Sequence, residues 1–210
     1  MSELGAYLAR NWATVFTLTV EHIKLFFITI FFATLIGLAL GVLTAKSQKF
    51  SFVVPVFNSL QSAPDLILLA LALYFLGTGA VAALAAFFVK GILPILRNTY
   101  SGIVSLDPNV IEAAKGMGMS QRQILFRIEL PLAMPVIIAG IRVASVIAIS
   151  VLTLSAYIGV SSLGVLIAQG IATSNRQALL TGSAMTALLA ILMNYALFLT
   201  EKLLRKRRSA

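Results

Sequence analysis

The sequence predicts an all-α protein that crosses a membrane about five times. Hydrophobic residues make up 60% of the 210 residues, charged residues make up 11%, and the mean hydropathy is +0.99. A water-soluble core of this size cannot bury so much apolar surface. The net charge of +9 does not indicate nucleic-acid binding, because the 16 lysines and arginines fall in short segments between apolar runs.

Five apolar segments approach the roughly 20 residues that a helix needs to cross the hydrocarbon core of a bilayer. They are residues 23–45, 52–76, 80–97, 131–155 and 178–200. Residues 1–22 are expected to be an external segment at the membrane interface. We do not expect them to be a signal peptide, because their apolar stretch is short and no small-residue cleavage site follows it. Residues 201–210 form a basic tail that is expected in the cytoplasm.

The distribution of positive charge predicts which side of the membrane each loop faces. Eleven cations lie in or beside the loops at 46–51 and 98–130 or in the tail. Only Arg10, Lys24 and Arg176 lie in the other connections. Because cytoplasmic loops carry the excess of Lys and Arg, we expect the N-terminus outside and the C-terminus inside.

The long cytoplasmic loop has the signals of two short helices. Asp107 and Pro108 are typical of a helix start, and the first helix is expected to run to about Lys115. Gly116 and Gly118 are expected to end it.

A second helix is expected to begin at Ser120, where Ser120 and Gln123 have the spacing of a capping box. Pro131 and Pro135 then favour a new start for the fourth span. The loop is therefore predicted to be a helix-turn-helix unit between two spans.

Four polar residues of the second span are expected to lie on one helical face, since their spacing is i, i+3, i+4, i+7. They are Asn58, Gln61, Ser62 and Asp65. Polar side chains at membrane depth face protein or water. The face is therefore either a pathway lining or a contact with another membrane subunit, or a set of ordinary interhelical hydrogen bonds. Pro64 is expected to kink this helix.

Arg142 is expected at mid-membrane depth and needs a partner there. Asp65 is the carboxylate predicted within the apolar interior, so one hypothesis pairs Arg142 with Asp65. The alternative is that Arg142 reaches the cytoplasmic surface along its aliphatic stem. Lys90 has the same choice between a partner in the interior and the surface, and the surface is favoured for Lys90.

Residues 157–177 are a glycine-punctuated connection at the outer face, either partly re-entrant or a sixth span. Tyr74, Phe75 and Tyr157 lie near that face and either meet a cationic substrate through their rings or anchor the protein at the interface. Gly37 and Gly41 have the GxxxG spacing that permits close helix approach.

A fixed pattern runs through residues 112–131: Glu-Ala-Ala, three residues, Gly, nine residues, Ile, one residue, Leu-Pro. The pattern resembles the EAA loop of ABC-importer permeases, here residues 108–131. The resemblance implies the MetI-like type I permease fold for residues 23–200. An amphipathic helix that simply rests on lipid headgroups is the alternative, but it does not require the glycine or the fixed interval.

The resemblance also implies a role for individual residues of the EAA loop. Its first helix is expected to dock in a groove of a separate ATPase subunit. Glu112 would supply polar contacts there, Ala113 and Ala114 close packing, and Gly118 the turn. The cations expected to pair with acidic residues of the ATPase are Lys115, Arg122 and Arg127.

From Leu93 to Gly170 the chain is similar to the permeases of importers for the quaternary-amine osmoprotectants glycine betaine, carnitine and choline. Many relatives have Ile-Gly-Ala-Gly-Gly-Leu-Gly where residues 158–164 read Ile-Gly-Val-Ser-Ser-Leu-Gly, so this outer loop is expected to be stiffer. Permeases of methionine-type amino-acid importers share the EAA loop, and a stand-alone channel or secondary carrier is a further alternative.

The resemblance implies a multi-pass permease of the bacterial cytoplasmic membrane that works with a second permease, two ATPases and an external substrate-binding protein. The chain has no phosphate-loop motif, so ATP and magnesium are expected in the partner ATPase. With no cysteine and one histidine, His22, which falls outside the expected spans, we expect no catalytic or metal site.

Overall fold

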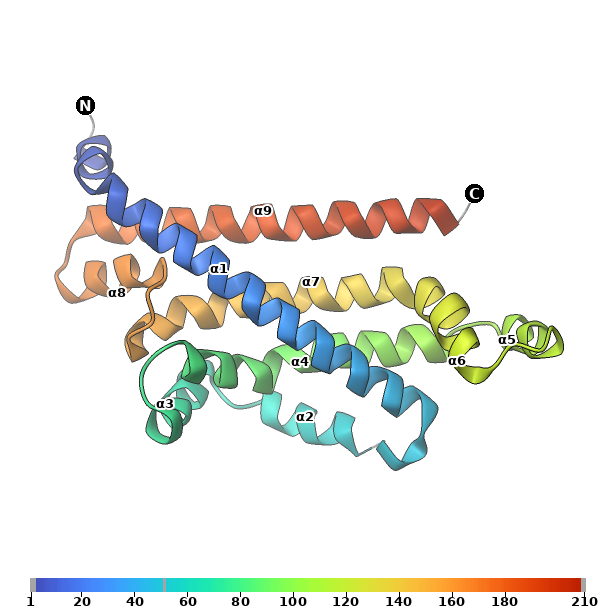
Figure 1. The fold of residues 1–210 in the computed structure, drawn as a ribbon. Helices are drawn as coiled ribbons and strands as arrows, with labels where there is room; N and C mark the ends of the chain where they lie inside the picture. Colours follow the sequence, from blue (N-terminus) through green and yellow to red (C-terminus); the bar gives the residue numbers. More distant parts are fainter. Residues whose placement is uncertain (1–2, 51, 209–210) are drawn as a thin grey trace.

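The computed structural model describes residues 3–50 and 52–208, and within these ranges it contains helices and no strand (Figure 1). The long helices are α1 (Glu3–Lys46), α4 (Ala80–Val104), α7 (Leu130–Leu154) and α9 (Arg176–Arg208). The short α-helices are α2 (Val53–Gln61), α3 (Asp65–Leu76), α5 (Pro108–Gly116), α6 (Gln121–Ile124) and α8 (Gly164–Ala172). Single turns lie at η1 (Gln48–Phe50), η2 (Leu125–Glu129) and η3 (Ser155–Ile158).

The prediction of an all-α bundle with about five membrane spans is confirmed. Among the described residues, four helical segments are long and apolar enough to cross a bilayer, and the bent pair α2 and α3 makes a fifth span if counted as one. In Figure 1 the N-terminus and α8 lie at one end of the bundle, and α5, α6 and the C-terminus lie at the other.

Helix α1 begins at Glu3 and runs to Lys46. Residues 3–22 are therefore part of the first long helix, whereas the sequence predicted a separate segment. The helix has 44 residues, which is about 66 Å at 1.5 Å per residue and twice the thickness of a hydrocarbon core. Its first half is held by protein contacts: Val15 and Leu18 are buried against Leu163, Leu166 and Leu189 of the α8 and α9 region. Residues 201–208 of the expected tail likewise belong to α9.

The centre of the bundle is made by α1, α4 and α7, which approach closely where glycines face them. A Cβ on Gly41 would lie 2.5 Å from the Cβ of Thr99, and one on Gly37 would lie 2.8 Å from the Cβ of Ile95. A Cβ on Gly140 of α7 would lie 2.7 Å from the carbonyl oxygen of Pro94. The close approach predicted from the spacing of Gly37 and Gly41 is therefore confirmed.

The second predicted span is two helices and not one. Helix α2 ends at Gln61, α3 begins at Asp65, and their axes differ by 102°. Pro64 is extended, with ψ of 142°. The helix stops before it because proline has no N–H to continue the ladder and disfavours helical geometry in the residue that precedes it. The predicted kink is thus a complete break.

Residues 157–177 do not form a sixth span in the described structure. After the turn η3 the chain reverses at Gly159, whose φ is +83°, and forms the nine-residue helix α8 beside the start of α9. The Ser162 hydroxyl donates to the carbonyl oxygen of Leu152 at 2.8 Å and accepts from the N–H of Gly164. These bonds fasten the loop to the end of α7.

The prediction that Pro131 and Pro135 begin a new helix is wrong. Helix α6 passes through the π-helical turn η2 directly into α7, and the apolar helical segment runs from Gln121 to Ile158. The π turn accommodates Pro131 near the start of α7. Proline has no N–H, so regular α-helical geometry would leave one carbonyl there without a donor.

Candidate coupling loop and membrane-embedded polar residues

Helix α5 starts as its sequence predicts. The Asp107 side chain accepts a hydrogen bond from the N–H of Asn109 at 2.9 Å, and Pro108 occupies the first turn. The helix ends at Gly116, and the chain turns at Gly118 with φ of +77°. Only glycine adopts that conformation without strain, so the glycine of the EAA pattern has a direct conformational role here.

The second helix of the EAA loop starts with the predicted capping box. The Ser120 N–H donates to Oε1 of Gln123 at 2.7 Å, and the Gln123 N–H donates to the Ser120 hydroxyl at 3.4 Å. Two N–H groups that would otherwise lack partners are thereby satisfied.

The helices α5 and α6 of the EAA loop lie at one end of the bundle (Figure 1). The exposed residues of the loop include the carboxylate Glu112, the small residue Ala113 and the cations Lys115, Arg122 and Arg127. Ala114 is fully buried inside the chain. It was expected to pack against a partner, but it presents no surface to one.

The four polar residues of the second span do not share one helical face. Asn58 and Gln61 belong to α2, Ser62 lies in the break, and Asp65 opens α3. The Ser62 hydroxyl donates to the carbonyl oxygen of Ser59 at 2.7 Å and so satisfies the end of α2. The spacing argument assumed a continuous helix, which the 102° bend removes.

Asp65 pairs with Lys90 of α4 and not with Arg142. The Lys90 Nζ and the Asp65 Oδ1 are 2.7 Å apart, and both side chains are mostly buried. Lys90 lies near the middle of α4, so the expectation that it reaches the membrane surface is wrong. This ion pair fixes the start of α3 to α4.

Arg142 pairs with Glu201 of α9, where Nη1 and Oε2 are 2.7 Å apart. The guanidinium also lies 5.6 Å from the centre of the Phe198 ring, a cation-π distance. The hypothesis that pairs Arg142 with Asp65 is therefore wrong. Glu201 was placed in the tail because the apolar run ends before it, but α9 continues past this residue.

Two further polar residues were missed by sequence reasoning. Glu129 is buried and forms an ion pair with Lys46, the last residue of α1, and 83 positions separate the two. His22 lies within the long helix α1 and is fully buried, and its Nδ1 accepts from the Leu163 N–H at 3.4 Å. No local signal marks either contact, since each joins segments far apart in the sequence.

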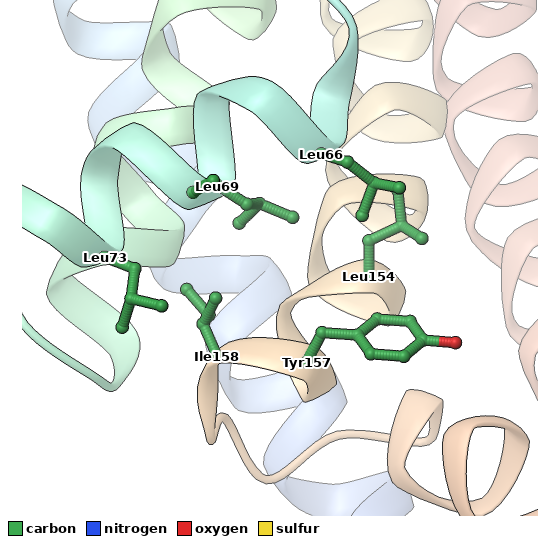
Figure 2. Close-up of a pocket in the computed structure, with 7 residues that line it drawn as sticks. Leu66, Leu69, Leu73, Leu154, Tyr157 and Ile158 are labelled. Carbon is green, nitrogen blue, oxygen red and sulfur yellow. The ribbon is translucent and has the colours of Figure 1, made fainter. Parts of the chain in front are cut away.

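An apolar pocket of about 410 Å³ lies between α3 and the end of α7 (Figure 2). Figure 2 shows Leu66, Leu69 and Leu73 of α3 on one side, and Tyr157 with its hydroxyl turned away from them on the other. Tyr74 and Phe75 do not line this pocket but stack edge to face with each other at 5.0 Å. Of the three aromatic residues singled out in the sequence, Tyr157 alone borders the pocket.

A family model described as binding-protein-dependent transport system inner membrane component matches residues 33–210. The chain belongs to this family. Proteins of this kind are membrane-spanning permease subunits of ABC importers, which work with ATPase and substrate-binding partners. The chain is accordingly a transport subunit and not an enzyme, and the ATPase activity of such transporters lies in separate subunits.

Curated relatives match the chain along most of its length. It is 35% identical to the glycine betaine/carnitine/choline transport system permease protein OpuCD of Bacillus subtilis, over 97% of this chain and 90% of that protein. It is 40% identical to the osmoprotectant import permease protein OsmY of Salmonella typhimurium, over 83% of this chain and 75% of that protein.

Among solved structures, the chain is similar to the inward-facing MetNI methionine ABC transporter, with a TM-score of 0.82 and 22% identity. The likeness covers 97% of this chain and 99% of that one, and it shows the MetI-like fold.

Proposed function

We propose that this chain is the permease subunit of an ATP-driven importer for a quaternary-amine osmoprotectant such as glycine betaine, carnitine or choline. The observation that carries the substrate class is the 35% identity to OpuCD over 97% of the chain. The likeness to a methionine transporter at 22% identity concerns the fold, so it does not favour an amino acid as the substrate. A stand-alone channel or carrier is disfavoured by membership of a binding-protein-dependent family.

The EAA loop is the proposed docking site for the ATPase. Helix α5 carries Glu112 and Ala113 on its exposed surface, and the Asp107 cap and the Gly118 turn fix its direction. Glu112 would contact polar groups of the ATPase, while Lys115, Arg122 and Arg127 would pair with its acidic residues. Ala114 supports the loop from inside.

The transporter is proposed to contain two permeases, either two copies of this chain or this chain and a paralogue, together with two ATPases and an external binding protein. The chain would lie in the bacterial cytoplasmic membrane with the N-terminus outside and the EAA loop inside, because the Lys and Arg residues of the connections gather at that end. Arg97, Lys115 and Arg122 are among those cations.

The residues Asn58, Gln61, Ser62, Asp65 and Arg142 are proposed to have different roles. Asp65 and Arg142 hold helices together through Lys90 and Glu201. The half-buried Asn58 and Gln61 of α2 remain candidates for a pathway or permease contact.

The test is reconstitution of the chain into liposomes with and without its ATPase and binding protein. We expect ATP-dependent uptake of radiolabelled glycine betaine, carnitine or choline by the full complex, none of methionine, and no flux through the chain alone. The double variant Glu112→Ala/Gly118→Val should insert normally but uncouple ATP hydrolysis from uptake, with Gly116→Ala as its matched control. Unchanged uptake by the double variant would refute the role assigned to the EAA loop.

A further inference from the structure

The continuous helical segment that runs from α6 through η2 into α7 contains a site where it can bend. Between α6 and α7 the turn η2 is π-helical over residues 125–129, and Pro131 follows two residues later. A π turn is wider than an α turn, and proline removes one hydrogen-bond donor from the ladder, so helices bend at such places. A push on α5 and α6 would therefore be partly absorbed here before it reached α7.

Glu129 occupies the last position of that weak turn and is tied to another helix. Its side chain is 5% exposed, and its carboxylate contacts the ammonium group of Lys46. Lys46 is the last residue of α1, which packs along α4 through the glycine contacts at Gly37 and Gly41. A carboxylate so poorly hydrated depends on its cation, because separating the two would leave a buried charge without a partner.

The ion pair of Glu129 with Lys46 connects the π turn η2 to the end of α1. On one side of η2 lie α5 and α6, and on the other lies α7, whose residues Ala133 and Ile137 form a buried cluster with Ile103 of α4. A contact from α1 at this level holds η2 in place. The same contact makes α1 follow any displacement of η2.

We propose that Glu129 and Lys46 are positioning residues that brace the π turn, so that movement of the EAA loop passes to α1 and α7 together. The pair stays closed throughout the transport cycle. This inference rests on the proposed function, because it concerns how the EAA loop acts on the spans.

The first experiment measures the number of ATP molecules hydrolysed per substrate imported by the reconstituted complex. Glu129→Gln and Lys46→Met should raise this number about five- to tenfold, the size of a typical coupling effect between two sites. The charge exchange Lys46→Glu/Glu129→Lys should bring it back toward the wild-type value. Lys49→Met is the matched control, since it removes an exposed cation three residues from Lys46 and should leave the number unchanged.

A second experiment replaces the ion pair by a covalent link and remains informative if single variants assemble poorly. The sequence contains no cysteine, so Lys46→Cys/Glu129→Cys introduces the two thiols alone. Joining them with a short bifunctional thiol reagent should preserve coupled uptake, whereas the unlinked pair should be uncoupled. Lys46→Cys treated with the same reagent is the control.

Two outcomes would overturn the inference. One is a wild-type stoichiometry in Glu129→Gln, which would mean that the pair transmits nothing. The other is loss of uptake on cross-linking that returns when the link is cleaved, which would mean that the pair has to open. Either leaves the proposed function intact, because that function fails only if the wild-type complex itself shows no ATP-driven osmoprotectant uptake.

Discussion

The EAA loop and the bent pair of α2 and α3 both interrupt the long helices of the bundle, but different interactions hold them. In the EAA loop the defining hydrogen bonds join residues two or three positions apart, as in the Asp107 cap and the Ser120 capping box. In the bent pair the defining contact is the ion pair of Asp65 with Lys90, 25 positions away. The loop is therefore expected to keep its shape when neighbouring helices move, while the bent pair depends on α4.

The comparison is tested most strongly by removing the carboxylate at the bend. Asp65→Leu leaves the Lys90 ammonium without its partner at membrane depth, and we expect a loss of about 2 to 3 kcal/mol in stability. Thermal unfolding in detergent measures this loss. The double variant Asp65→Leu/Lys90→Leu should regain most of it, and a double variant as unstable as the single one would show that the ion pair is not what holds α3.

A somewhat smaller effect is expected from Gly41→Ala, which tests close packing between the long helices. The added Cβ would lie 2.5 Å from Thr99 and 2.8 Å from the carbonyl oxygen of Leu96, so α1 and α4 must separate. Overpacking of this kind costs about 2 kcal/mol. Thermal unfolding should show a lower midpoint than for Gly116→Ala, whose Cβ meets nothing within 4 Å; equal midpoints would contradict the packing argument.

In the EAA loop, Gly118→Ala should cost about 1 to 2 kcal/mol through backbone strain alone. The φ of +77° disfavours a side chain, although a Cβ there meets no atom within 4 Å. Amide hydrogen exchange should become faster in residues 108–124 and remain unchanged in α4 and α7. If exchange also accelerates in those two helices, the loop is not as independent as its local hydrogen bonds indicate.

The smallest effect is expected from Ser120→Ala, which removes one half of the capping box. The loss of an N-cap at an exposed site costs about 0.5 to 1 kcal/mol. Hydrogen exchange at Arg122 and Gln123 reports it directly. Ser120→Asp keeps an acceptor at the cap and should retain the wild-type exchange rates, so faster exchange in this variant would argue against the capping role.

The same contrast between local and distant contacts explains which features could be predicted from the sequence. The Asp107 and Ser120 caps, the turn at Gly118 and the glycine contacts at Gly37 and Gly41 were all predicted, because each depends on residues close in the chain or on a short helical spacing. The break at Pro64 was predicted only as a kink. Its angle depends on how α3 packs against α4, which local sequence does not encode.

The ion pairs could not be predicted because depth alone does not say which helices are neighbours. Arg142 and Asp65 were matched as the two charges expected in the interior, yet the structure gives each a different partner. Glu201 was assigned to the tail because hydropathy ends the last span before it. The ion pair of Glu129 was missed because its partner Lys46 was counted only as a loop cation.

The 102° bend between α2 and α3 has a consequence for the environment of the subunit. The Ser59 and Leu60 carbonyls accept hydrogen bonds from Ser62 and Ala63, but the first N–H groups of α3, at Asp65 and Leu66, lack intrahelical partners. The Asp65 contact with Lys90 puts these N–H groups level with the middle of α4. Hydrocarbon chains offer such groups nothing to bond with. This flank of the molecule must therefore be sealed from the fatty acyl chains by water or by protein when the transporter is assembled.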